Sequence, residues 1–251
     1  MLIIISKYYG CFFILFIYVT LIKFFNKVIF IKTFTMHNTV KNLIYIEELI
    51  KSKLNHDKLP TIIAVSKTFP IENILPLLER GHLHYGENKV QEALDKWSNI
   101  KLKHNEVKLH LIGRLQTNKV KFALKIFDYI HSLDSEKLAN KIADEQTKQN
   151  KRPKIFIQVN IGKEDQKSGI NKEKLKDFCN FCNNLNLDII GTMCIPPNDG
   201  NTEKYFSEMN NINNELNFKE LSMGMSGDYL EAIKNNATYV RVGSKIFGSR
   251  T

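Results

Sequence analysis

Short apolar segments alternate with amphipathic helical patterns along most of this chain. From residue 36 onward there are eight apolar runs rich in β-branched and aromatic residues, and helix-like patterns separate them. Strict alternation of strand and helix predicts a parallel sheet, and eight units close best as a (β/α)8 TIM barrel of the α/β class. The predicted strands are Thr61–Lys67, His82–Glu87, Lys108–Ile112, Tyr129–Leu133, Lys154–Ile161, Leu187–Ile195, Phe218–Met223 and Thr238–Val242.

Seven helical patterns lie between these strands, an opening helix precedes them and a short turn follows. An open, doubly wound sheet is the alternative fold, but no G-x-G-x-x-G follows the first strand. A barrel built from residues 36–251 leaves little chain for a second domain, so we predict a single domain. The predicted helices are Val40–Leu54, Ile71–Arg80, Val90–Trp97, Asn118–Lys125, a long helix capped by Asp134–Glu136 that runs to about Gln149, Lys172–Asn183, Thr202–Leu216, Tyr229–Lys234 and the turn Lys245–Phe247.

The first 35 residues differ in character from the rest. Tyr8–Ile22 holds no charged residue and is flanked by Lys7 and Lys23, but it is shorter than the roughly 18 to 20 residues that cross a bilayer. No small-residue cleavage site follows it. Organelle targeting or membrane anchoring explains this segment as well as a misassigned start does, with Met36 as the working start. We exclude residues 1–35 from the fold and expect a cytoplasmic protein, with membrane contact only if the extension is retained.

The net charge of +10 is typical of a nucleic-acid-binding protein, but the rest of the sequence does not support that function. Four of the positive charges are lysines within residues 1–35, a segment without Asp or Glu, and the others are spread thinly over predicted helices. We find no zinc-finger spacing, RNP-type motif or basic-aromatic cluster. We therefore expect no nucleic-acid partner.

The four cysteines predict neither a metal site nor a redox pair. Cys179 and Cys182 form a C-x-x-C within a helical pattern, where positions i and i+3 share a face, and no second pair or nearby histidine completes a zinc site. Two thiols that face the core are the expected arrangement, and Cys11 and Cys194 stand apart.

Lys67 ends the first predicted strand and is a candidate for covalent chemistry. A central strand does not bury an ammonium cheaply, so the lysine is expected at the carboxyl end of the strand, where parallel α/β folds bind ligands. Partial desolvation there favours the neutral amine, which can attack a carbonyl to form a Schiff base. The alternative is that Lys67 simply extends to solvent.

Glycine and serine cluster after the last two predicted strands, where this fold customarily binds phosphate. Glycine lets backbone N–H groups approach an anion, and serine adds a hydroxyl donor. Ordinary turns or a sugar-phosphate site would look similar, and a Schiff-base aldolase is one alternative. A Schiff-base lysine that faces a phosphate site suggests pyridoxal phosphate, whose aldehyde and phosphate lie at opposite ends of one ring. The cluster comprises Gly224, Ser226, Gly227, Gly243 and Ser244.

Longer motifs support this interpretation. Together they resemble the pyridoxal phosphate homeostasis protein family, in order, from about Leu59 to Arg250. The family in turn resembles the barrel half of alanine racemase, so the resemblance implies an alanine racemase N-terminal-domain-like barrel. The motifs are AVSKTFP, HYGENKVQEA, HLIGRLQTNKVK, QVNI followed by QKSG, GTMCIPP, LSMGMSGDYLEAI and VRVGSKIFGSR.

The resemblance assigns roles at both ends of the cofactor ring. It implies that Lys67 carries pyridoxal phosphate as an internal aldimine and that Arg241 faces the pyridine nitrogen. Because arginine can only donate, that nitrogen stays unprotonated and the ring is a poor electron sink. Asn88 of the G-E-N motif is expected to line the ring, although a strand-end turn explains it too. The family usually has tyrosine where this chain has Lys89, which puts the role of that tyrosine in doubt.

The remaining matches concern the phosphate. Ser226, Gly243 and Ser244 match the phosphate-contacting motifs of the family, and Gly227 is assigned there with them. Glu87 and Asp228 are expected to support the site from behind, although a helix cap explains Asp228 equally well.

The resemblance implies a carrier and not an enzyme. Alanine racemase and related decarboxylases draw a catalytic base from a β-domain after the barrel, and we expect this chain, which ends after the eighth unit, to lack it. We expect a monomer that holds pyridoxal phosphate and passes it to pyridoxal phosphate-dependent apo-enzymes. An amino-acid racemase or decarboxylase is the alternative.

Overall fold

The computed structural model describes residues 36–53, 59–162, 164 and 168–249. The extension 1–35 and the end of the last motif, Arg250, lie outside the described residues. Within the described ranges, no helix is both long enough and apolar enough to cross a membrane.

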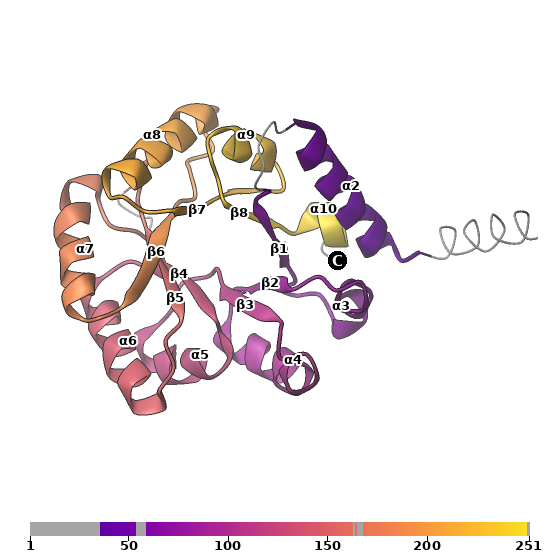
Figure 1. Cartoon of the computed structure of the whole chain (residues 1–251), viewed down its shortest axis with the longest axis horizontal. Coiled ribbons are helices and arrows are strands. Elements are labelled where there is room, and N and C mark those ends of the chain that lie inside the picture. Colours follow the sequence, from indigo (N-terminus) through magenta and orange to yellow (C-terminus); the bar gives the residue numbers. More distant parts are fainter. Residues whose placement is uncertain (1–35, 54–58, 163, 165–167, 250–251) are drawn as a thin grey trace, which may run out of the picture.

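Eight parallel strands close into a barrel in sequence order, which confirms the predicted (β/α)8 fold (Figure 1). The last strand closes on the first through pairs such as Thr61 with Tyr239 and Ala64 with Val242. The strands are β1 Thr61–Val65, β2 His84–Glu87, β3 Lys108–Leu111, β4 Tyr129–Leu133, β5 Lys154–Gln158, β6 Asp188–Met193, β7 Glu220–Met225 and β8 Tyr239–Val242.

Helices surround the ring of strands, and α2 packs beside α10, next to the start of the barrel (Figure 1). Asn42 of α2 donates its Nδ2–H to the carbonyl oxygen of Ile246 in α10 at 2.9 Å. The helices are α2 Asn38–Lys53, α3 Leu75–Glu79, α4 Val90–Lys103, α5 Val120–Ile126, α6 Glu136–Gln149, α7 Leu175–Asn184, α8 Thr202–Glu215, α9 Tyr229–Lys234 and α10 Ser244–Phe247, with 3-10 turns η1 Ile71–Asn73, η2 Thr117–Lys119 and η3 Lys172–Lys174.

Alternation along the strands divides the apolar side chains between two regions. One region fills the layer between the barrel and its helices and includes Trp97 and Phe206, which have no exposed surface. The other lies inside the barrel, where Ile63, Phe156 and Tyr239 pack together. Successive side chains of each strand therefore point alternately into the barrel and toward the helices.

Most predicted boundaries differ from the observed ones by one to three residues, and two of these differences have a local reason. The first strand ends at Val65 and not at Lys67, because Ser66 begins a turn in which Thr68 adopts a left-handed φ of 67°. The helix predicted to end at Trp97 continues to Lys103, through residues that are mostly solvent-exposed and of which only Ile100 packs against the core.

The cysteines in the described part of the chain are free and buried. Cys179 and Cys182 both face the core from α7, which confirms the prediction for them. Burial raises the pKa of the Cys179 thiol to about 11. Cys11 lies outside the described residues.

Candidate functional site

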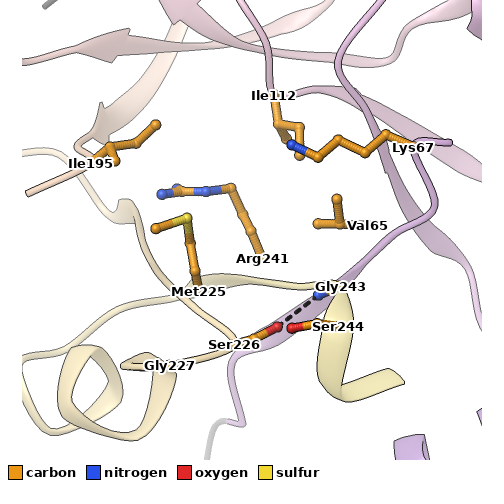
Figure 2. Close-up of a pocket in the computed structure, with 10 residues that line it drawn as sticks. All are labelled: Val65, Lys67, Ile112, Ile195, Met225, Ser226, Gly227, Arg241, Gly243 and Ser244. Carbon is orange, nitrogen blue, oxygen red and sulfur yellow. Dashed lines mark hydrogen bonds between the residues drawn. The ribbon is translucent and has the colours of Figure 1, made fainter. Parts of the chain in front are cut away.

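A cavity of about 490 Å³ opens at the carboxyl ends of the strands. Of the seven residues predicted for the site, six line this cavity, and Asn88 does not. Figure 2 shows Lys67 and Arg241 entering it from different sides, with the serine and glycine loops below them. The lining residues are Val65, Lys67, Ile112, Ile195, Met225, Ser226, Gly227, Arg241, Gly243 and Ser244.

Lys67 lies in the turn directly after β1 and is half-buried. Its side chain extends into the cavity and its amine lies near Ile112 (Figure 2). The turn is fixed on both sides, because Ser66 N–H donates to the Gly86 carbonyl at 3.0 Å and Thr68 N–H donates to Glu92 Oε1 at 2.6 Å. The fixed turn thus positions the base of the half-buried Lys67 side chain, which reaches the apolar side chain of Ile112.

A buried carboxylate supports this turn from behind. Glu87 Oε1 accepts hydrogen bonds from Ser66 Oγ at 2.7 Å, Trp97 Nε1 at 3.0 Å and Lys96 Nζ at 3.0 Å. Burial raises the pKa of Glu87, and the Lys96 ammonium opposes that rise. The Glu87 side chain has no exposed surface, so it stabilises the ends of β1 and β2 and does not enter the cavity.

Arg241 lies inside the barrel on β8 and is almost fully buried. Its Nη1 donates to the Ser222 carbonyl at 2.9 Å and to Ser222 Oγ at 2.8 Å, and its Nη2 donates to the Cys194 carbonyl at 2.9 Å. Burial lowers the pKa of Arg241, but a guanidinium does not deprotonate in proteins. Three of its five donors are thus used, and the described residues supply no acceptor for the other two.

The loops after β7 and β8 are tied together by one hydroxyl. Ser226 Oγ accepts from Gly243 N–H at 3.1 Å and from Lys245 N–H at 3.5 Å, the first of which is drawn in Figure 2. Gly227 and Ser244 are exposed at the cavity, and their N–H groups have no acceptor among the described residues. These donors are free to bind an anion.

A left-handed glycine shapes the first of these loops. Gly224 has a φ of 87°, and a Cβ there would lie 2.5 Å from the Ala232 Cβ. Asp228 Oδ1 accepts from Met225 N–H at 2.5 Å. Asp228 therefore stabilises the loop that carries Ser226 and Gly227.

Asn88 follows β2 but does not line the cavity. Its backbone packs so tightly against Gly113 that a Cβ at that glycine would lie 2.3 Å from the Asn88 carbonyl oxygen. Asn88 Oδ1 is buried without a hydrogen-bond partner, and Lys89 is exposed. The expected contact between Asn88 and a ring stays a prediction.

Sequence reasoning assigned no role to the apolar walls or to the anchors of Arg241. Val65, Ile112, Ile195 and Met225 line the cavity without polar chemistry. Val65 could have been found from strand alternation, since it is two residues before Lys67. The anchoring carbonyl of Cys194 had no sequence signal, because any residue supplies a carbonyl.

The lining therefore combines an amine, a donor-rich guanidinium and backbone donors between apolar walls. Its charged groups, Lys67 and Arg241, are both cationic, and its hydrophobic walls suit a flat ring. In the described ranges no three His, Cys, Asp or Glu side chains are grouped so that they could hold a metal ion. The site is suited to a planar, anionic molecule that carries a reactive carbonyl.

Comparison with known proteins agrees with this class of site. Residues 47–251 match the alanine racemase N-terminal domain family, and the chain belongs to that family. Alanine racemase from Clostridium difficile 630 has the same barrel, with a TM-score of 0.62 and 17% identity over 85% of this chain and 57% of that chain. At that identity the likeness shows the fold alone.

Within the family, the more similar relatives are pyridoxal phosphate homeostasis proteins, which confirms the resemblance read from the motifs. The protein of that name from Aquifex aeolicus (strain VF5) is 39% identical over 199 residues, which are 75% of this chain and 86% of that protein. PipY of Synechococcus elongatus PCC7942, solved with pyridoxal phosphate bound, gives a TM-score of 0.74 and 32% identity, covering 84% of this chain and 100% of PipY.

Proposed function

We propose that this protein binds pyridoxal 5'-phosphate as a Schiff base on Lys67 and serves intracellular vitamin B6 homeostasis. The observation that carries the proposal is the meeting of Lys67, the unused donors of Arg241 and the Ser226–Gly227 and Gly243–Ser244 loops in one cavity. Pyridoxal phosphate supplies an aldehyde, an aromatic ring and a phosphate. The relatives and PipY support the same ligand.

Each of these groups has a matching protein group. The Lys67 amine adds to the aldehyde carbon and one water leaves, while the apolar walls limit access of solvent. The N–H groups of Gly227 and Ser244 and the Ser226 hydroxyl hold the phosphate. Gly243 joins the two phosphate loops, because its N–H donates to Ser226 Oγ at 3.1 Å. We assign Asn88 to the edge of the ring.

Arg241 supports binding without catalysis. A protonated guanidinium gives a hydrogen bond to the ring nitrogen and cannot supply a proton to it, so the ring withdraws electrons weakly. Among the described residues, no carboxylate lines the cavity to remove a proton from a bound amine. We therefore propose a carrier that delivers the cofactor to apo-enzymes, acting as a cytoplasmic monomer with residues 36–251 as one domain.

Borohydride reduction tests the bond to Lys67. We expect reduction of the protein incubated with pyridoxal phosphate to add one pyridoxyl mass to the peptide that contains Lys67. Lys67→Ala is expected to lose that label and the visible absorption of the bound cofactor, with unchanged circular dichroism. Lys121→Ala, at an exposed lysine away from the cavity, is the matched control and is expected to keep both. A label only on other lysines of the wild-type protein would contradict the proposal.

The racemase or decarboxylase alternative has its own test. Incubation of the cofactor-loaded protein with single amino acids is expected to leave their chirality intact and to release no CO2. Turnover of an amino acid that disappears in Lys67→Ala would show that the protein is an enzyme and not a carrier.

A further inference from the structure

A line of polar side chains runs through the inside of the barrel from Arg241, buried except at its half-buried far end. Ser222 Oγ, which accepts from Arg241, lies 2.9 Å from His131 Nδ1. His131 Nε2 lies 2.9 Å from His110 Nδ1, and His110 Nε2 lies 2.9 Å from His84 Nδ1. We call Ser222, His131, His110 and His84 the histidine chain.

The histidine chain departs from what usually fills a TIM barrel. Branched aliphatic residues dominate such interiors, and a buried polar group is costly unless it is hydrogen-bonded. His110 stacks on Tyr129 with centroids 4.2 Å apart, and His131 stacks on Phe156 at 4.3 Å. The rings are thus clamped in one orientation while their nitrogens bond in sequence, which is the arrangement of a fully connected network.

The imidazoles are neutral at physiological pH. Burial lowers the pKa of His84 to about 4, and burial with the neighbouring His131 lowers that of His110 well below its usual value. Burial and the Arg241 charge do the same for His131. Each ring therefore has one N–H donor and one acceptor nitrogen, and the chain must run in one direction.

Arg241 selects that direction. Because it donates to Ser222 Oγ, the hydroxyl hydrogen of Ser222 is directed to His131 Nδ1. His131 then carries its hydrogen on Nε2 and donates to His110, which in the same way donates to His84. The opposite direction would leave the Ser222 hydroxyl hydrogen without an acceptor among the described residues.

The far end of the chain lies at the opposite face of the barrel. His84 borders a second cavity of about 340 Å³ beside the start of β1, together with His82, Glu47 and Lys51. The charge of Lys108 also lowers the pKa of His84, and the charge of Asp128 raises it. The hydrogen-bonded chain thus joins this second cavity to the cofactor cavity.

We propose that the histidine chain is a set of positioning residues that holds the Arg241 guanidinium through Ser222, so that its two unused N–H groups face the cofactor cavity. This inference rests on the proposed function, because it assigns the ring-nitrogen end of the cofactor to those two donors. It adds roles for four residues that do not themselves line that cavity.

Nuclear magnetic resonance of the protein without cofactor tests the direction of the chain. With 15N-labelled histidine, we expect His84, His110 and His131 to be neutral at pH 7 with the hydrogen on Nε2. Ser222→Ala is expected to change the 15N chemical shift of His131 Nδ1 more than those of the His110 and His84 nitrogens. A hydrogen on Nδ1 of His110 or His131 would overturn the proposed direction. The measurement needs no cofactor, so it stands even if Lys67 carries no pyridoxyl label.

Cofactor binding tests the consequence for Arg241. We expect Ser222→Ala to raise the Kd for pyridoxal phosphate about tenfold and to shift the absorption of the bound cofactor, because one hydrogen bond to a charged group is lost. Ser222→Thr, which keeps the hydroxyl, is expected to restore both. Ser132→Ala is the matched control, since Ser132 is equally buried beside His131 but its Oγ has no partner. If Ser222→Ala leaves the affinity and the spectrum unchanged while Lys67 is still labelled, the positioning role is contradicted. The Schiff base on Lys67 would then still stand.

Discussion

Lowering the pH from 7 to 4 is expected to remove most of the stability of this protein. Burial lowers the pKa of His82 and of His84 from 6.5 to about 4, and His110 and His131 lie lower still. In the unfolded chain these rings bind protons as the pH falls below about 6.5, whereas in the folded chain they do not until about 4 or below. The contribution of these histidines to the free energy of unfolding is therefore fully present above pH 6.5 and is lost as the pH falls from 6.5 to about 4.

The size of this effect follows from linkage. Each such histidine lowers the free energy of unfolding by up to about 1.4 kcal/mol per pH unit, so four approach roughly 5 kcal/mol per unit. A whole domain is stable by only about 5 to 15 kcal/mol. Glu87 acts in the opposite sense, because its raised pKa favours the folded state as the pH falls, but it is one group against four.

Urea unfolding at pH 7, 6 and 5 measures this dependence. His82→Gln is expected to reduce the slope between pH 6 and 5 by about one quarter, since it removes one of four linked groups. His104→Gln is the control, because that side chain is 39% exposed and pairs with the exposed Glu106. A free energy of unfolding that is constant from pH 7 to 5 would contradict the neutral histidine chain.

The barrel could be predicted because alternation is a local signal. Each strand carries its own apolar run and each helix its own spacing, so the order of elements was readable without knowledge of tertiary contacts. Lys67 was found because strand ends in this fold gather at one mouth, whereas the role of Arg241 came from the resemblance to the pyridoxal phosphate homeostasis proteins. Boundaries failed where a turn replaced a strand, as after Val65.

The histidine chain could not be read in the same way. His84, His110 and His131 come from three strands. His84 and His110 begin two of the motifs quoted above, but no single motif joins the three histidines, and only the strand register brings them into contact. His84 pairs with Lys108 in that register and His110 pairs with Tyr129. Their common signal is weaker: each occupies an inward position of its strand, where an aliphatic residue would be expected.

Gly191 shows the same limit for the backbone. The β5–β6 register shifts beside it, and a Cβ at this position would lie 1.7 Å from the Glu220 carbonyl oxygen. The need for glycine arises from contact between β6 and β7, which are distant in the sequence. In the chain alone, Gly191 indicates only a bulge or a close approach.

Replacing Lys96 by methionine is expected to destabilise the protein by about 3 to 5 kcal/mol, the usual result of breaking a buried ion pair from one side. The Lys96 ammonium lies 3.0 Å from Glu87 Oε1, and the two side chains are 11% and 0% exposed. It also donates to the Ser66 carbonyl at 3.0 Å. Without it, Glu87 keeps its neutral donors Ser66 and Trp97 but loses its counter-charge.

The matched double variant separates charge from packing. Glu87→Gln combined with Lys96→Met removes both charges, so we expect it to recover more than half of the loss. Lys103→Met, at an exposed position of the same helix, is expected to change the free energy of unfolding by less than about 0.5 kcal/mol. Because Ser66 precedes Lys67, the single variant is also expected to slow pyridoxyl labelling of Lys67. Equal stability of the single and double variants would show that Glu87 is neutral in the folded protein, and the pair would then not be what holds the Lys67 turn.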